Sequence, residues 1–190
     1  MDKQTEEILQ KIEEAEYVLV GLGQEFDMEF FLQSREDYRR IREELQQQNV
    51  LWLLPYVEEQ FRRQYLPEME AEIEKGLQKL AKVLEKKSYF VVSSSLNHKL
   101  AEVPWKKMLL KKERFVAPCG DWTKKQCPDG CEEGIQTVTE ADEEQLQESF
   151  KKLQTNGFSV PDLGKCPKCG KKLVLNNVYA GRYDEKGYLK

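Results

Sequence analysis

The sequence predicts an α/β protein in which a cysteine-rich insert follows a parallel sheet. Two short apolar runs, at 17–20 and 89–92, have the length and composition of buried strands. Between them, apolar residues recur at helical spacing over 67–84. Strand, helix and strand in this order favour parallel pairing through a right-handed crossover. Two close pairs of cysteines follow from residue 127 onward and indicate a metal site of their own.

Composition narrows the classes of function. The chain has 190 residues, a formal net charge of −4 and 10% aromatic residues, which together predict one folded domain or a main domain with an insert. The sequence has no basic stripe of the kind that indicates a nucleic-acid partner. The longest uncharged apolar run, 49–57, is far shorter than the ~20 residues of a membrane span. No basic-then-apolar leader opens the chain, so we expect a cytoplasmic protein with neither a nucleic-acid nor a membrane partner.

Helices are predicted from apolar spacing and from end signals. The segment 2–16 is amphipathic, and 51–65 is expected to be helical in part. Ser34 followed by Asp37 has the form of a capping box and predicts a helix start. Proline at the first position of 67–84 suits the first turn of that long helix.

A third short strand, 114–116, completes the expected sheet. Ligands of parallel sheets bind where loops leave the carboxyl ends of the strands. Three loops occupy such positions, at 21–25, 93–98 and 118–121. We expect any ligand site of the sheet to be built from these loops.

The cysteine pairs predict a zinc site with the ligands Cys127, Cys131, Cys166 and Cys169. Two pairs with two to four residues between successive ligands are typical of tetrahedral zinc, and four thiolates leave no position open for catalysis, so the zinc is expected to be structural. Four buried, reduced cysteines without a metal are the alternative. A strand at 135–138 and a helix opened by a second capping box, at 139–142, are predicted between the pairs.

Several segments together resemble the sirtuins, a family of NAD-dependent protein deacylases. The stretch 166–181 is similar to the family's second zinc knuckle and the strand after it. The segment 18–23 resembles the strand that leads into the family's glycine turn, and 91–97 resembles its next strand and polar loop. The segment 116–120 falls where the family has a histidine–glycine pair.

The resemblance implies a Rossmann-like parallel sheet with helices on both faces and an inserted small zinc-binding module with four cysteine ligands. It also implies that the chain is C-terminally incomplete, with an apolar sheet face left exposed and prone to self-association. The implied parts are a Rossmann-like part at 1–120 that includes the helical segment 26–66, the zinc module at 121–172, and a truncated return to the Rossmann-like domain at 173–190.

The resemblance further implies NAD as a cofactor, bound by residues of the first two loops, Gly21, Gly23, Ser95 and Asn97. Ser95 stands at the family's asparagine and Asn97 at its aspartate. Cys119 stands at the general-base histidine, and Glu25 near the phosphates, where a carboxylate repels a diphosphate. These substitutions imply degenerate catalytic positions, so deacetylation itself is not expected.

Three functions remain open at this stage. The first is a sirtuin-like NAD-dependent protein deacylase or ADP-ribosyltransferase. The alternative is a non-catalytic, zinc-stabilised module that binds NAD, ADP-ribose, or a protein or peptide partner. A third uses Cys119 as nucleophile and His98, the single histidine, as base. We prefer to regard His98 as a polar loop residue and Cys119 as a small buried thiol.

Overall fold

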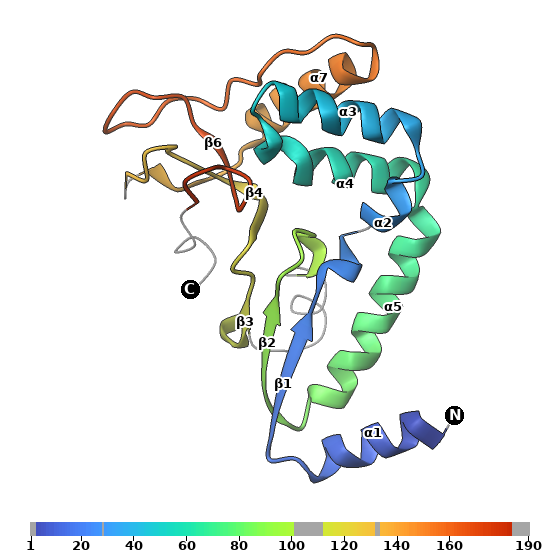
Figure 1. Ribbon diagram of the computed structural model, residues 1–190. Helices are drawn as coiled ribbons and strands as arrows, with labels where there is room; N and C mark the ends of the chain where they lie inside the picture. The colour runs from blue at the N-terminus through green and yellow to red at the C-terminus, as the bar shows by residue number, and fades with distance from the viewer. Residues whose placement is uncertain (1–2, 28, 101–111, 132–133, 184–190) are drawn as a thin grey trace.

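The computed structural model describes residues 3–27, 29–100, 112–131 and 134–183. Within these residues the chain is a mixed α/β protein with two three-stranded sheets, one parallel and one antiparallel (Figure 1). Among the helices of the described residues, none combines the length and the apolar character of a membrane-spanning segment.

The parallel sheet confirms the predicted strands. It contains β1 (Tyr17–Leu22), β2 (Ser88–Ser93) and β3 (Phe115–Val116), in the order β1-β2-β3. Both neighbouring pairs are parallel, as the strand–helix–strand pattern predicted.

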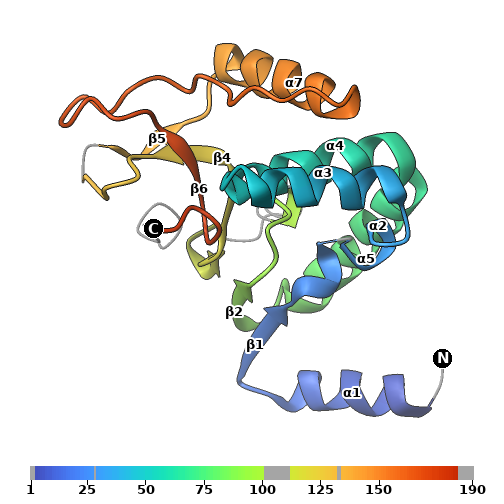
Figure 2. The ribbon, with the colours of Figure 1, turned by 45° about the horizontal axis from the view of Figure 1, so that its top comes forward.

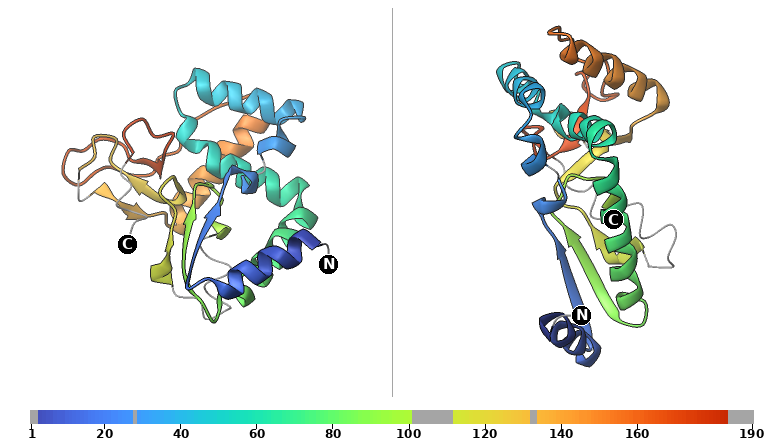
Figure 3. Two further views of the ribbon diagram at one scale, coloured as in Figure 1. Left: turned by 60° about the horizontal axis from the view of Figure 1, so that its bottom comes forward. Right: turned by 90° about the vertical axis from the view of Figure 1, so that its right-hand side faces the viewer.

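Helix α5 (Pro67–Leu84) covers one face of this sheet and runs along β1 and β2 (Figure 3). Its proline stands in the first turn, as predicted. Leu77 and Leu84 of the helix share a buried apolar cluster with Val91 of β2 and Phe115 of β3. The helical spacing seen in the sequence therefore marks the side of α5 that packs on the sheet.

The opposite face of the parallel sheet is not covered by a helix within the described residues, although helices were expected on both faces. Tyr17 and Leu19 of β1 are 73% and 75% exposed, and Phe90 of β2 is 38% exposed. Leu19 and Phe90 are register partners, so these side chains form one apolar surface. Helix α1 (Lys3–Glu14) lies near the start of β1 (Figure 1) and buries none of its side chains.

A second layer combines helices with the antiparallel sheet (Figure 2). The antiparallel sheet has the order β5-β4-β6. Its strands and the helices of this layer are β4 (Gly120–Gln126), β5 (Gln136–Thr137), β6 (Val174–Asn177), α2 (Glu29–Leu32), α3 (Glu36–Gln47), α4 (Leu54–Tyr65) and α7 (Glu140–Gln154). Short 3₁₀ turns occur at η1 (Gln24–Phe26), η2 (Leu51–Leu53) and η3 (Lys112–Arg114).

The helices between 29 and 65 share their main apolar core with the antiparallel sheet. Phe61 of α4 contacts Tyr38 of α3 and Phe150 of α7 in edge-to-face geometry, with ring centroids 5.5 and 5.8 Å apart. Trp122 of β4 and Leu175 of β6 belong to the same buried cluster. The helical segment 26–66, assigned from the sequence to the part with the parallel sheet, therefore packs mainly on the sheet that carries the cysteines.

The segment after the second cysteine pair also stays in the antiparallel sheet. β6 pairs with β4, with Gln126 opposite Val174. The predicted return to the parallel sheet over 173–190 is accordingly not seen in residues 173–183, and residues 184–190 lie outside the described residues.

Candidate functional site

The antiparallel sheet brings the two cysteine pairs together. Cys127 follows directly after β4, and Cys166 and Cys169 lie in a turn shortly before β6. Because the end of β4 is opposite the start of β6, the two turns leave the sheet side by side.

The four cysteines form a cluster that can hold a metal ion, as predicted. The sulfurs of Cys127, Cys131, Cys166 and Cys169 all lie within 4.8 Å of one another, and the Sγ atoms of Cys127 and Cys169 are 3.4 Å apart. Four sulfurs bound about 2.3 Å from one zinc ion stand roughly 3.8 Å apart, so the cluster has the size of a tetrahedral site.

Glycines shape both turns. The N–H of Gly130 donates to the Cys127 carbonyl (3.0 Å), and the N–H of Gly170 donates to the Cys166 carbonyl (2.9 Å). Both glycines have positive φ, +69° and +74°, which other residues rarely adopt. At Gly134 the constraint is space, because a Cβ there would stand 2.6 Å from the Cβ of Cys127.

The local field favours a thiolate at Cys127. Burial by itself would raise the pKa of this thiol, but N–H groups of Cys131 and Asp129 and hydrogen bonds from the other thiols lower it to about 6. The hydrogen bond with Cys127 and burial raise the pKa of Cys131 to about 12. A metal ion must therefore displace protons from this cluster as it binds. Of the lysines around the site, Lys171 forms an ion pair with Asp129 at 2.8 Å.

At the carboxyl edge of the parallel sheet, the loop after β2 contacts Phe26 and Asp27, which directly follow the first strand-end loop. The N–H of Leu96 donates to Asp27 Oδ1 (2.7 Å), and the Ser95 hydroxyl donates to the same oxygen. The side-chain amide of Asn97 lies 3.4 Å from the Phe26 carbonyl. Burial raises the pKa of Asp27, and the hydrogen bonds from Ser95 and Leu96 oppose that rise. The residues predicted for cofactor binding thus lie at one edge, and their binding of a cofactor stays a prediction.

The glycine turn after β1 fits a diphosphate poorly in this structure. The N–H of Gly23 donates to Glu25 Oε1 at 3.1 Å. A Cβ built on Gly23 would clash with Glu25 Oε2, whereas one on Gly21 would meet nothing within 4 Å. The carboxylate of Glu25 therefore occupies the face of the turn next to Gly23.

The third loop gives no support to a Cys119 nucleophile. Burial and the nearby Asp27 carboxylate raise the pKa of Cys119, whereas an activated thiol needs a lowered one. His98 is 7% exposed, and its Nδ1 accepts a hydrogen bond from Trp122 Nε1 (3.1 Å). Glu59 Oε2 lies 3.6 Å from the same nitrogen. His98 is thus part of a buried polar group rather than a base beside Cys119.

A set of buried charges near this edge was not predicted from the sequence. Glu59 is fully buried in an ion pair with Arg62, which is itself 2% exposed. Glu58 beside it is 5% exposed and accepts a hydrogen bond from the Tyr38 hydroxyl at 2.7 Å. Burial is the main cause that raises the pKa of Glu58, to about 8. The sequence feature that could have indicated these buried charges is the pair of adjacent acids directly after the apolar run 49–57.

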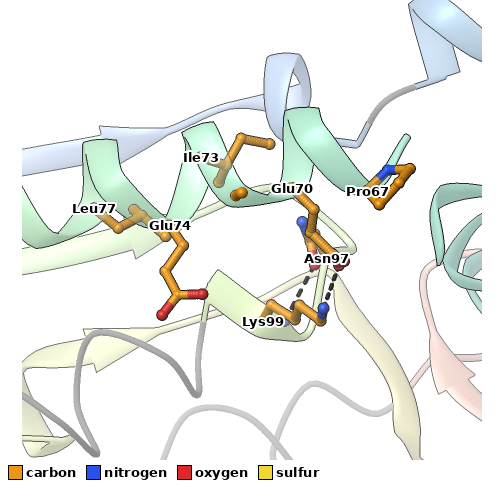
Figure 4. Close-up of a pocket in the computed structure, with 8 residues that line it drawn as sticks. Pro67, Glu70, Ile73, Glu74, Leu77, Asn97 and Lys99 are labelled. Carbon is orange, nitrogen blue, oxygen red and sulfur yellow. Dashed lines mark hydrogen bonds and ion pairs between the residues drawn. The ribbon is translucent and has the colours of Figure 1, made fainter.

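One cavity of about 230 Å³ opens between α5 and the loop after β2 (Figure 4). Asn97 is the one predicted site residue that lines it. Lys99, directly after this loop, forms an ion pair with Glu70 of α5 across the cavity wall. Ile73 and Leu77 supply an apolar side.

Comparison with known proteins identifies no family for this chain. No family model matches the chain. No curated protein matches it either.

Proposed function

We propose that the chain is a divergent sirtuin-like protein, in which a parallel sheet of the nucleotide-binding type is joined to an antiparallel sheet that carries a structural zinc centre. One observation supports this most strongly. Leu22 and Ser94 belong to the two segments that resemble the family's cofactor loops, and the Ser94 N–H donates to the Leu22 carbonyl (2.9 Å) at the carboxyl edge of a parallel sheet, while a four-cysteine cluster follows in the same chain. The two features come from separate parts of the sequence, so their joint presence favours one family over an accidental match.

The metal in this proposal is zinc with a structural role. Four thiolates fill a tetrahedral coordination shell and leave no place for a substrate or a reactive water. The antiparallel sheet and the helices packed on it would depend on the ion, because zinc binding contributes to folding free energy at such sites.

Gly21, Gly23, Ser95 and Asn97 are the residues that would hold NAD or ADP-ribose. Bound NAD would supply an electrophilic ribose carbon, with nicotinamide as leaving group. The chain's own groups support little of the remaining chemistry. Cys119 is a thiol with a raised pKa, and Asn97 uses its side-chain oxygen to accept the Lys99 N–H at 3.1 Å. We therefore propose that deacetylation is near background.

Nicotinamide release tests the enzymatic part of this proposal. The purified chain is incubated with NAD and an acetyl-lysine peptide, and nicotinamide is followed over time by chromatography. We expect release close to the rate without protein. The variant Cys119→His should not restore it, because the glycine turn and the loop with Ser95 and Asn97 would still hold the cofactor badly. A robust rate from the unmodified chain would show that the assignment of these loop positions is wrong.

The second candidate is a non-catalytic, zinc-stabilised module that binds a protein or peptide partner. The observation in its favour is that polar groups at this edge of the sheet bind one another, as Asp27 does with the Ser95 hydroxyl and the Leu96 N–H. Melting curves with ADP-ribose separate the candidates, since a ligand that binds only the folded state raises the melting temperature. A shift that grows with ADP-ribose concentration supports nucleotide binding. Unchanged curves at millimolar ADP-ribose support the protein-binding module.

A further inference from the structure

We infer that the glycine turn after β1 is an anion site that the chain fills with its own Glu25 carboxylate, which a phosphate-bearing ligand must displace. This inference rests on the proposed function, because it takes the carboxyl edge of the parallel sheet as a nucleotide site. It goes beyond that function by assigning to Glu25 the role of an internal competitor.

The geometry at Gly23 carries the inference. The backbone N–H of Gly23 is the kind of donor that glycine turns offer to phosphates, and here Glu25 Oε1 accepts it at 3.1 Å. Both carboxylate oxygens lie within 3.3 Å of the position a Gly23 Cβ would take. The carboxylate thus occupies the approach that only a glycine leaves open.

The neighbouring loop repeats the pattern. Asp27, which is 8% exposed, accepts the backbone N–H of Leu96 at 2.7 Å. Backbone donors at the ends of both β1 and β2 therefore already hold a carboxylate. The two differ in one respect, since Asp27 is buried whereas Glu25 is exposed at the surface. Glu25 can turn into solvent without leaving a buried group unpaired, so it is the displaceable member.

The expected effect follows from charge. A diphosphate brings two negative charges to the turn, and Glu25 must either leave or repel both. Because Glu25 is exposed, the effective dielectric is close to that of water, and each pair of charges contributes a several-fold change in affinity. Replacing Glu25 by glutamine keeps the size of the side chain and removes its charge. We expect ADP-ribose to bind this variant at least about tenfold more tightly, a change of about 1.4 kcal/mol.

Calorimetric titration of the full chain at fixed ionic strength tests this. The proteins are the unmodified chain, Glu25→Gln, and the control Glu85→Gln, which removes an equal charge beyond α5, near the start of β2. The probes are ADP-ribose, inorganic pyrophosphate and adenosine. Glu25→Gln should gain affinity for ADP-ribose and pyrophosphate but not for adenosine, and Glu85→Gln should bind all three like the unmodified chain.

Two different failures can be told apart. Equal affinity of the unmodified chain and Glu25→Gln for ADP-ribose would overturn the role of Glu25 and leave the nucleotide site standing. Absence of ADP-ribose binding by every variant, with melting curves that show them folded, would refute the nucleotide site and the inference with it. A gain shared by adenosine would also count against the inference, because adenosine has no phosphate to compete with Glu25.

Discussion

Glu58 offers a sharp test of the buried charges described above, because its stability effect has a definite sign. Glu58→Gln keeps the oxygen that accepts the Tyr38 hydroxyl and abolishes the titration. Burial raises the pKa of Glu58 in the folded chain, to about 8 from an ordinary 4.5, and the nearby acids Asp27 and Glu29 add to the rise, while Tyr38 and Arg62 oppose it. We expect the variant to lose much of the pH dependence of unfolding.

The sign follows from proton binding. Between pH 4.5 and about 8 the folded chain keeps the Glu58 proton that the unfolded chain has released. Stability must therefore fall as the pH rises through this window, and the loss is complete above the folded pKa. Below pH 4.5 the folded and the unfolded chain both hold the proton, and Glu58 does not lower the free energy of unfolding. At about 1.36 kcal/mol per pKa unit, the full loss is on the order of 5 kcal/mol at most.

Urea unfolding at several pH values between 4.5 and 8.5 measures this effect. Other groups titrate in the same range, so the informative quantity is the difference in unfolding free energy between Glu58→Gln and the unmodified chain. We expect the variant to gain relative stability as the pH rises, up to several kcal/mol at pH 8. The exposed-site variant Glu85→Gln should run parallel to the unmodified chain. Parallel curves for Glu58→Gln as well would refute the raised pKa.

Three further predictions concern the metal cluster and the sheet face. Purified protein should carry about one zinc per chain by elemental analysis. Cys166→Ser should lower the zinc content, whereas Cys119→Ser should leave it unchanged. Zinc loss in Cys119→Ser would overturn the ligand assignment. Gly134→Ala should lower the melting temperature, because the added Cβ would stand 2.6 Å from the Cβ of Cys127. The control Gly76→Ala lies within α5, where an added Cβ meets nothing within 4 Å, and should stabilise the chain by about 0.5–1 kcal/mol. Equal effects of the two substitutions would contradict the crowding at Gly134. Leu19→Glu, at a side chain 75% exposed, should reduce hydrophobic-dye fluorescence and light scattering; unchanged signals would mean that this face does not drive association.

The elements predicted well were those whose local pattern agrees with their packing. The apolar spacing of 67–84 became the buried side of α5, and the runs 17–20 and 89–92 became β1 and β2. The second capping box is confirmed, because the Thr139 hydroxyl accepts the Asp142 N–H at 3.3 Å and the Asp142 carboxylate accepts the Thr139 N–H at 2.8 Å.

The first capping box was wrong for a local reason. Arg35 lies between the two expected partners and donates two hydrogen bonds to Asp37, at 3.0 and 2.8 Å. Arg35 becomes the N-cap residue itself, and Ser34 donates to the Phe31 carbonyl instead. A pattern of residue types cannot show such competition, because the arginine satisfies the carboxylate at closer range.

Strand β4 could not be predicted, because its buried residues are largely polar. Lys125 is 7% exposed and reaches both carboxylate oxygens of Asp142 at 2.8 Å, while its third hydrogen bond goes to the Leu163 carbonyl. Those partners lie 17 and 38 residues away in the sequence. Judged from its local sequence alone, the segment 120–126 therefore has the pattern of a solvated loop. The buried Glu58 was missed for the same reason, since its partner Tyr38 comes from another helix.

The paired turns that hold the cysteines have a consequence for parts of the chain that touch no sulfur. An ion bound there would close a loop whose base is the pairing of β4 with β6 and whose far side is α7. The Arg40 guanidinium of α3 donates to the Leu153 carbonyl of α7 at 2.9 Å, and Phe150 packs on Phe61. Opening the loop returns its conformational freedom to the unfolded chain and loosens α7. Chelation should therefore appear first as faster amide exchange in α7 and then in α3 and α4, which pack on it, so that the metal would stabilise helices outside its own turns.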